Sequence, residues 1–316
     1  MNHAIDVGMV GAGIISETHC DVLAQWPSVA LIFVVDPNPD ASVSFKNSAP
    51  PRYDTVTDAL GGHDPDLVVV ASPTQTHAAI VREVLTGSNA RVLVEKPMVH
   101  DLAALADLLA LAPGVDLRSR LFVAHHFAFS PEVMWAADQI AANPEWGPVT
   151  RATCAFHDPY ILRGEQAFAS YVSSWIDSGS NQLSMLTRFV EFRERESFHE
   201  TAGGATAWST LVTHTGDDTT GLARLFTSWQ TGTSSKRTTL ELARTGVEIW
   251  LDHTAMTGFA VRDGQLLTTC VNDGLTPRKI SHYQPLYQSL LSDHPDPVMG
   301  IDTATTVAEL LAGARI

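Results

Sequence analysis

Short apolar runs separated by stretches of helical length fill the first third of the chain. The runs are Ala4–Val10, Ala30–Val35, Leu67–Ala71, Arg91–Val94 and Leu121–Ala124. They are rich in β-branched residues and do not alternate with polar positions, which is typical of strands buried on both faces. Helices are predicted between them, at residues 14–25, 78–85 and 102–111. This alternation predicts a doubly wound parallel sheet.

The pattern changes after a helix predicted at Pro131–Ala142 and a loop at residues 143–148. Strands of period two then follow without helices between them: Thr150–His157, Ala205–His214, Gly221–Gln230, Thr238–Ala243 and Val247–Asp252. A hairpin is expected at residues 259–271, turned by Asp263-Gly264. Two closing helices are expected at residues 282–292 and 303–314. Such a succession predicts a large, mostly antiparallel open sheet.

The fold class expected is therefore α/β, with an N-terminal Rossmann-like domain and a C-terminal α+β domain. We place the dinucleotide-binding domain at residues 1–126 and the substrate-binding and oligomerisation domain at residues 127–316. The C-terminal helix could pack back on the first domain. A chain of 316 residues is long enough for two domains with a sizeable core.

Charge and cysteine content narrow the function classes. The formal net charge of −15 makes nucleic acid and anionic membranes poor partners. No apolar run approaches the ~20 residues of a membrane helix, and the N-terminus lacks the features of a signal peptide. The three cysteines lie far apart, which indicates a reducing, cytoplasmic location. The thirteen histidines show no metal-binding spacing, so no metal site is expected.

A glycine-rich turn follows the first strand. Gly11 permits a tight turn, and Gly13 allows the backbone to approach a pyrophosphate at the start of a helix that opens with Ile14 and Ile15. Ser16 stands where the usual fingerprint has its third glycine. The motif alone is weak evidence, but strand, loop and helix follow in the order that dinucleotide binding requires.

Asp36 ends the second strand and is placed to accept hydrogen bonds from the ribose hydroxyls of NAD. Its charge would repel the extra phosphate of NADP, and no arginine follows it directly in Pro37-Asn38-Pro39. The cofactor expected is therefore NAD. The alternative interpretation is a turn residue, because Asp-Pro often begins a loop.

Two further strand ends carry polar residues. Ser72, Pro73 and Thr74 follow the third strand and are expected to form a wall beside the dinucleotide, with Thr76 as helix N-cap and His77 next to it. The strand Arg91–Val94 ends in Glu95-Lys96-Pro97, so it would deliver an acid and a cation to the edge of the sheet where ligands bind. The alternative is a surface ion pair.

These motifs, in this order and spacing, resemble the Gfo/Idh/MocA (glucose–fructose oxidoreductase, inositol dehydrogenase, rhizopine catabolism) family. The resemblance is carried by GAGII, Asp36, SPTQTH and EKP. It implies a Rossmann domain, a nicotinamide cofactor, and Lys96 in the active site with Glu95 beside it. By the same resemblance VAHHFAFSP aligns with the family's VGFNRRFxP motif. His126 then replaces an asparagine and Ala128 an arginine.

The stretch from Asp177 to Ser184 resembles the family's DxGxHxxD pattern. Asp177 and Gly179 are kept, whereas Asn181 replaces the histidine and Ser184 the second acid. A histidine can exchange a proton near neutral pH and an amide cannot, but Asn181 can still hydrogen-bond a substrate oxygen. The alternative interpretation of Asp177 is a helix N-cap.

Hydride transfer at a carbon bearing oxygen needs a proton carrier. The candidates are Lys96, whose pKa would fall beside an oxidised nicotinamide, and His126. Asp177 is expected among the catalytic residues. The residues expected to bind substrate are Lys96, His126, Tyr160, Asp177 and Asn181, and His157 is a weaker candidate.

Three functions remain open at this point. The first is NAD-dependent oxidation or reduction of a sugar, cyclitol or related polyol. The second is an NAD(P)-dependent reductase of a less polar ketone or imine in a biosynthetic pathway. The third is a non-catalytic, cofactor-binding sensor.

The second sheet needs a cover on the face without helices. Trp208, Leu225, Trp229 and Trp250 lie on its expected strands or at their ends. We expect a partner subunit to supply the cover, in a homodimer or homotetramer. The alternative is that these side chains are core.

Overall fold

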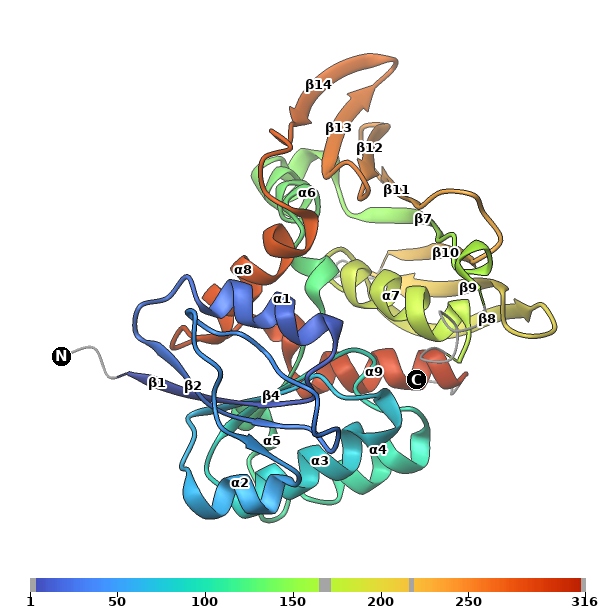
Figure 1. Ribbon diagram of the computed structural model, residues 1–316. Coiled ribbons are helices and arrows are strands. Elements are labelled where there is room, and N and C mark those ends of the chain that lie inside the picture. The colour runs from blue at the N-terminus through green and yellow to red at the C-terminus, as the bar shows by residue number, and fades with distance from the viewer. Residues whose placement is uncertain (1–3, 165–171, 216–218, 314–316) are drawn as a thin grey trace. The chain divides into compact units, whose positions relative to one another are not determined.

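The computed structural model describes residues 4–164, 172–215 and 219–313 (Figure 1). The chain divides into two compact units. Unit 1 consists of Met1–Ala124 with Tyr283–Ala308, and unit 2 of His125–His282 with Glu309–Ile316. That residues 1–126 and 127–316 are separate domains in their own right stays a prediction.

Unit 1 is built on a six-stranded parallel sheet with strand order β3-β2-β1-β4-β5-β6. The strands are β1 Ile5–Val10, β2 Val29–Val35, β3 Arg52–Tyr53, β4 Leu67–Val70, β5 Arg91–Val94 and β6 Leu121–Val123. The chain winds to one side of β1 and then to the other, so the order reverses between β1 and β4. Ligands of doubly wound sheets bind at such a reversal, at the carboxyl ends of the strands.

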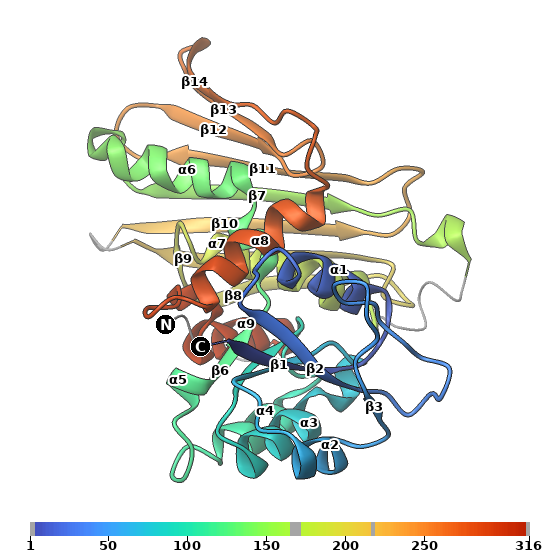
Figure 2. The same ribbon diagram turned by 60° about the vertical axis from the view of Figure 1, so that its left-hand side comes forward.

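Helices cover both faces of this sheet (Figures 1 and 2). They are α1 Ile14–Leu23, α2 Val56–Gly62, α3 Thr74–Gly87, α4 Leu102–Leu109 and α5 Leu117–Arg120, with parts of α8 Arg278–Leu290 and α9 Ile301–Ala312. Helix α1 lies on one face, and α2, α3 and α4 lie on the other. Every residue of β4 is buried, which confirms the prediction of strands covered on both sides.

The start of α3 differs from the prediction. The helix begins at Thr74, and Pro73 occupies the N-cap position. Thr76 is therefore not an N-cap; its hydroxyl donates to the carbonyl oxygen of Pro73 at 2.7 Å, within the first turn. Proline has a fixed φ and fits a helix start, so the helix forms directly after it.

Unit 2 contains an eight-stranded sheet with order β14-β13-β12-β11-β7-β10-β9-β8. The strands are β7 Val149–His157, β8 Glu191–Glu200, β9 Thr206–His214, β10 Thr220–Ser228, β11 Ser235–Leu242, β12 Val247–Asp252, β13 Thr257–Arg262 and β14 Gln265–Cys270. All neighbours pair antiparallel except β7 and β10, which confirms the mostly antiparallel sheet. The hairpin β13–β14 turns at Asp263 and Gly264, both with positive φ.

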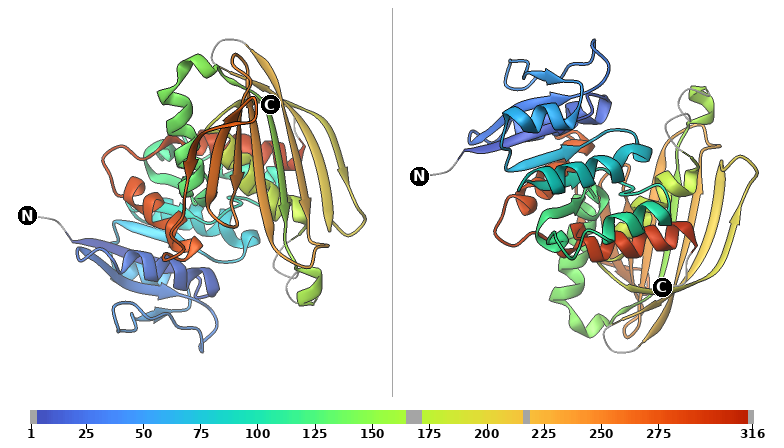
Figure 3. Two further views of the ribbon diagram at one scale, coloured as in Figure 1. Left: turned by 90° about the horizontal axis from the view of Figure 1, so that it is seen from above. Right: turned by 90° about the horizontal axis from the view of Figure 1, so that it is seen from below.

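The helices of unit 2 lie on one face of this sheet (Figure 3). They include α6 Pro131–Ala142 and α7 Ser180–Leu186, with the shorter turns η1 His126–Phe129 and η5 Trp175–Gly179 beside them. Side chains that point away from these helices remain exposed, among them Trp208 at 38% and Trp250 at 44%. Leu225 and Trp229 are buried, so for these two the core interpretation is correct.

Candidate active site

The glycine loop joins β1 to α1. Gly11 has φ +96°, and a Cβ there would lie 2.7 Å from the carbonyl oxygen of Ala71, so only glycine fits. A Cβ on Gly13 would meet nothing within 4 Å, and Ile14 beside it is 82% exposed. Ser16 supports the turn by donating from its hydroxyl to the carbonyl oxygen of Gly11 at 2.8 Å. The helix start therefore offers the open, close approach that a pyrophosphate needs.

Asp36 stands at the end of β2 and faces the same loop. Its Oδ2 accepts the backbone N–H of Ala12 at 2.9 Å, and its Oδ1 accepts that of Asn38 at 2.9 Å. The carboxylate thus forms the turn that the alternative interpretation expected and also braces the glycine loop. The residues of loop and strand end fit a dinucleotide whose ribose hydroxyls donate to this carboxylate.

The sequence analysis did not predict an arginine near Asp36. Arg52 comes from the short strand β3, donates to the backbone carbonyl oxygen of Asp36, and pairs with Asp54 at 2.7 Å. The sequence directly after Asp36 holds no arginine, but β3 pairs with β2 and delivers one. The expected preference for NAD therefore depends on the charge of Asp36 and not on a lack of nearby cations.

His77 supports the segment Ser72–Thr74, which follows β4. Its ring is 1% exposed, with Nε2 at 2.8 Å from the carbonyl oxygen of Ser72 and Nδ1 at 3.0 Å from that of Pro97. Burial lowers the pKa of His77. Ser72 and Thr76 join their hydroxyls at 2.7 Å. His77 therefore positions the Ser72–Thr74 segment and the loop after β5 through their backbones.

Glu95 is enclosed by side chains from two helices of unit 1. Its Oε1 accepts from the hydroxyl of Tyr283 at 2.5 Å and from Nε2 of His19 at 3.0 Å, and Nδ1 of His19 accepts from Tyr287 at 2.7 Å. Burial by itself would raise the pKa of the Glu95 carboxyl, but these donors hold it below its usual range. Glu95 thus fixes the end of β5 from which Lys96 projects.

Lys96 is half-buried at that strand end and follows the same edge of the sheet as Gly11 and Asp36. Its backbone N–H donates to Oε2 of Glu95 at 3.2 Å. The surface ion pair of the alternative interpretation is wrong for Glu95, which is 7% exposed and bonded to the buried hydroxyl of Tyr283 and to His19. Lys96 therefore places a cation at the edge of the sheet where ligands bind, next to the buried and hydrogen-bonded Glu95.

In unit 2, Asp177 and Asn181 lie on the helical run η5–α7. Both are 6% exposed, and the Asn181 amide donates to the carbonyl oxygen of Asp177 at 3.3 Å. Asp177 lies inside the helical run, so the N-cap interpretation is wrong. A Cβ on Gly179 would come within 2.7 Å of the Trp175 ring, which explains the glycine. The amide oxygen of Asn181 is buried and has no hydrogen-bond partner within the described part of the chain.

A buried ion pair near these residues was missed. Lys236 at the start of β11 donates from Nζ to Oδ1 of Asp158, which also accepts from Ser234 at 3.1 Å; Oδ2 accepts from Ser178 at 3.3 Å. Burial lowers the pKa of Lys236 although Asp158 opposes that shift, and the charge of Asp177 also acts on it. The sequence contained a signal for this pair, because Lys236 occupies a buried position in the alternating pattern of strand β11.

The other residues expected near the substrate also lie in unit 2. Tyr160 is half-buried with its ring centroid 5.7 Å from that of Trp229. His126 opens η1 and is half-buried, with Nδ1 at 3.1 Å from Nδ1 of His282 in α8. Within the described residues, no three histidine, cysteine or acidic side chains are arranged to hold a metal ion. No described helix has both the length and the apolar character to cross a membrane.

The strand order of unit 1, its glycine loop and Asp36 define a dinucleotide-binding protein of the Rossmann class. Residues 5–125 match a family described as an oxidoreductase family with an NAD-binding Rossmann fold. Over this N-terminal part the chain is similar to the Gfo/Idh/MocA family. The match agrees with the expected resemblance and confirms the expected NAD-binding Rossmann fold in this part of the chain.

The chain is also similar to individual proteins. It is 27% identical over 152 residues to inositol 2-dehydrogenase of Rhizobium meliloti, covering 48% of this chain and 45% of that protein. It spans less than half the length of the curated relatives it matches.

Two solved structures share the fold over almost the whole chain. One is UDP-N-acetylglucosamine 3-dehydrogenase from Acidithiobacillus ferrooxidans, with TM-score 0.76, 16% identity, and 100% of this chain and 97% of that chain covered. The other is the WlbA dehydrogenase from Bordetella pertussis in complex with NADH and UDP-GlcNAcA. It has TM-score 0.75 and 14% identity, with coverage of 99% and 95%. At these identities the likeness establishes the fold alone.

Proposed function

We propose that the chain is an NAD-dependent oxidoreductase acting on a carbon that bears oxygen in a sugar, cyclitol or related polyol. The observation that carries the proposal is the placement of Lys96 on the sheet edge that also holds the glycine loop and Asp36. The match of residues 5–125 to an oxidoreductase family supports it, as do the inositol and nucleotide-sugar dehydrogenases among its relatives and structural neighbours.

The cofactor half of the site is assigned to unit 1. NAD, when bound, accepts or returns the hydride. Gly11, Gly13, Ile14 and Ile15 would hold its pyrophosphate, and Asp36 its ribose. The segment Ser72–Thr74, with His77 behind it, would form the wall beside the ring, and Glu95 would keep Lys96 in place.

The substrate half is assigned to Lys96, His126, Tyr160, Asp177 and Asn181. Lys96 would orient the substrate oxygen and stabilise its developing charge, and His126 would carry the proton. The buried amide of Asn181 would hydrogen-bond a hydroxyl, and Asp177 would accept from one. A carboxylate and an amide are suited to a polyol, whose hydroxyls both donate and accept.

A second candidate is reduction of a less polar ketone or imine. It is favoured by the two family positions that have lost polar side chains, where Asn181 replaces histidine and Ala128 replaces arginine. A screen of NADH formation across sugars, nucleotide sugars, cyclitols and amino-polyols separates the two candidates. Turnover of a polyol supports the first, and turnover only of ketones or imines in the reverse direction supports the second. Tight NAD binding without turnover of any compound would indicate a sensor.

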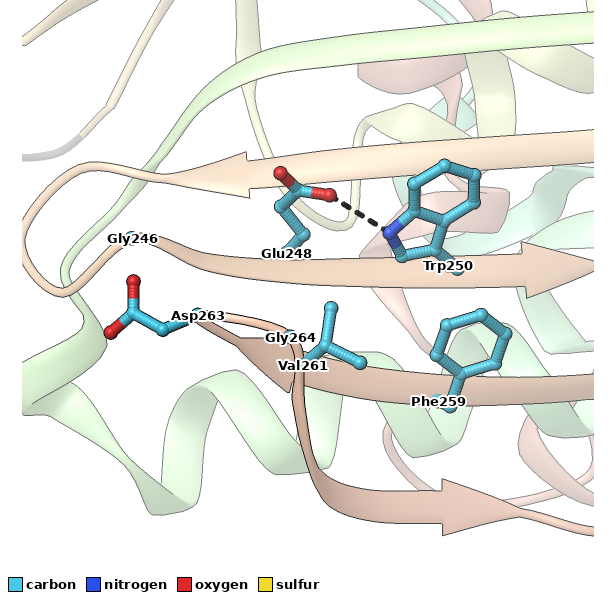
Figure 4. Close-up of a pocket in the computed structure, with 7 residues that line it drawn as sticks. All are labelled: Gly246, Glu248, Trp250, Phe259, Val261, Asp263 and Gly264. Carbon is cyan, nitrogen blue, oxygen red and sulfur yellow. Dashed lines mark hydrogen bonds between the residues drawn. The ribbon is translucent and has the colours of Figure 1, made fainter.

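We further propose that the exposed face of the unit 2 sheet joins copies of this chain. Figure 4 shows Trp250 and Phe259 side by side on β12 and β13; their rings are parallel within 7°, with centroids 6.1 Å apart. Both are more than 40% exposed, and with Val261 and Asp263 they line a shallow pocket of about 450 Å³. Trp250 donates to Glu248 at 2.9 Å, which keeps its ring flat on the sheet. A monomer by light scattering at micromolar concentration would refute this assignment.

A further inference from the structure

Two histidines of unit 2 meet through the same ring nitrogen. Nδ1 of His126 lies 3.1 Å from Nδ1 of His282, with the rings tilted by 32°. His126 is half-buried, whereas His282 is 1% exposed and packs edge-on against Phe127, 5.0 Å between centroids. A hydrogen bond between two Nδ1 atoms needs one hydrogen, carried by one ring and accepted by the other. The ring that carries it decides which nitrogen of His126 is protonated.

His282 is neutral at any pH near neutrality. Burial lowers its pKa to about 3; Glu132 opposes this shift, and Arg278 and His253 add to it. A neutral imidazole carries one proton, on Nδ1 or on Nε2. Its Nδ1 is engaged with His126, and its Nε2 is buried without a hydrogen-bond partner within the described residues.

The charge of Glu132 acts on the ring of His282. This carboxyl is fully buried, and its Oε1 accepts from Ser130 and from Nδ1 of His253, both at 2.6 Å. Burial alone would raise the Glu132 pKa, but His253 and the other donors hold it below its usual range, so the group is an anion. The negative charge of Glu132 therefore favours a proton on the ring of His282. With that proton on Nε2, the Nδ1 of His282 is an acceptor towards His126.

We propose that His282 is a positioning residue whose Nδ1 accepts a hydrogen bond from Nδ1–H of His126, so that His126 presents an unprotonated Nε2. This assignment rests on the proposed function for its role in catalysis. On oxidation of a substrate hydroxyl, the O–H bond and the C–H bond of the same carbon would break as a C=O bond forms; the O–H proton would pass to Nε2 of His126, and bound NAD would take the hydride from carbon. The imidazolium formed keeps its bond to His282, which stabilises the charge. Lys96 is then the orienting cation and His126 the proton carrier.

The first test needs no substrate. Side-chain ¹⁵N NMR of the wild-type protein at neutral pH, with His126 assigned from the His126→Asn variant, reports which ring nitrogen carries the proton. A protonated Nδ1 and a bare Nε2 on His126 are expected. A proton on Nε2 with a bare Nδ1 would overturn the proposal, whether or not the protein turns over any substrate. Absence of turnover with the expected tautomer would refute the proposed function and leave the positioning role of His282 standing.

The second test uses the active enzyme and two replacements of His282. His282→Leu removes the acceptor, and kcat should fall by ~10- to 100-fold, as when the partner that orients a functional histidine is lost. The acid limb of the pH–rate profile should move to lower pH, because the imidazolium has lost its stabilising acceptor. His282→Asn restores an acceptor and should recover most of the rate and the original limb. An unchanged limb in His282→Leu would contradict the proposal. His63→Asn is the control, since His63 bonds Tyr53 outside the site.

Discussion

Breaking the buried pair Lys236–Asp158 should destabilise the protein far more than breaking an exposed pair on the same sheet. The side chains of Lys236 and Asp158 are 6% and 10% exposed. Lys236→Met leaves the Asp158 carboxylate buried, where among the described residues the hydroxyls of Ser178 and Ser234 remain to compensate it. Removing one partner of a buried pair costs about 3–5 kcal/mol, because the remaining charge stays desolvated.

The double variant Lys236→Met/Asp158→Asn removes both charges and keeps an acceptor for the two serines. It should be more stable than Lys236→Met alone, with a coupling energy towards the upper end of about 0.5–3 kcal/mol. The matched control is Arg151–Glu241 on neighbouring strands of the same sheet, 3.0 Å apart with side chains 48% and 42% exposed. A cycle on this pair should give a coupling below about 1 kcal/mol.

Urea unfolding of all variants at neutral pH, followed by tryptophan fluorescence, measures these differences. The reasoning is refuted if Lys236→Met loses less than about 1 kcal/mol. It is also refuted if the double variant is no more stable than that single variant. A buried pair that behaves like the exposed control would mean that water reaches Asp158 in solution.

Three further outcomes are expected. Asp36→Asn should raise the affinity for NADP relative to NAD, because Arg52 then lies beside an uncharged residue. The double variant Asp36→Asn/Arg52→Met should lose that gain. Calorimetric titration of each variant with both cofactors measures the two affinities. The free energy of unfolding should fall as pH drops from 6.5 towards 3, by up to about 1.4 kcal/mol per pH unit from His282. The cause is that His282 binds a proton in the unfolded chain but stays neutral when its ring is buried. Urea titrations at several pH values should show that stability depends less steeply on pH in His282→Asn than in the wild type. Trp250→Asp should shift the assembly towards monomer in light scattering, and an unchanged mass would remove β12 from the interface.

Local patterns predicted most of the architecture. The apolar runs of unit 1 became its parallel strands, and the period-two runs became the second sheet. The helix at Pro131–Ala142 begins and ends where its pattern indicates, since proline at its first position and its apolar spacing agree. Strand β8 was missed because Glu191–Glu200 alternates charges at the edge of the sheet and has few apolar positions to reveal it.

The sequence predicted those residues of the candidate site that directly follow a buried strand. Gly11, Asp36 and Lys96 each follow a buried strand, and the topology brings those ends to one edge. The support behind them was not visible, because it comes from distant segments. Tyr283 bonds Glu95 across 188 positions of sequence, and His282 bonds His126 across 156. No local periodicity encodes a contact of that separation.

The central claim is that Lys96 acts on the substrate and not on the cofactor. The measurement that tests it most directly compares wild type and Lys96→Ala for NAD affinity and for single-turnover NADH formation with the substrate found in the screen. The account predicts nearly unchanged NAD binding and a loss of roughly 10²–10³ in rate, the usual contribution of a group that stabilises charge on the reacting oxygen. Asn181→Ala is the comparison: it cannot ionise, so it should weaken substrate binding by about 1–3 kcal/mol and leave the pH profile in place. Near-normal turnover in Lys96→Ala would show that the lysine is structural and would contradict the account.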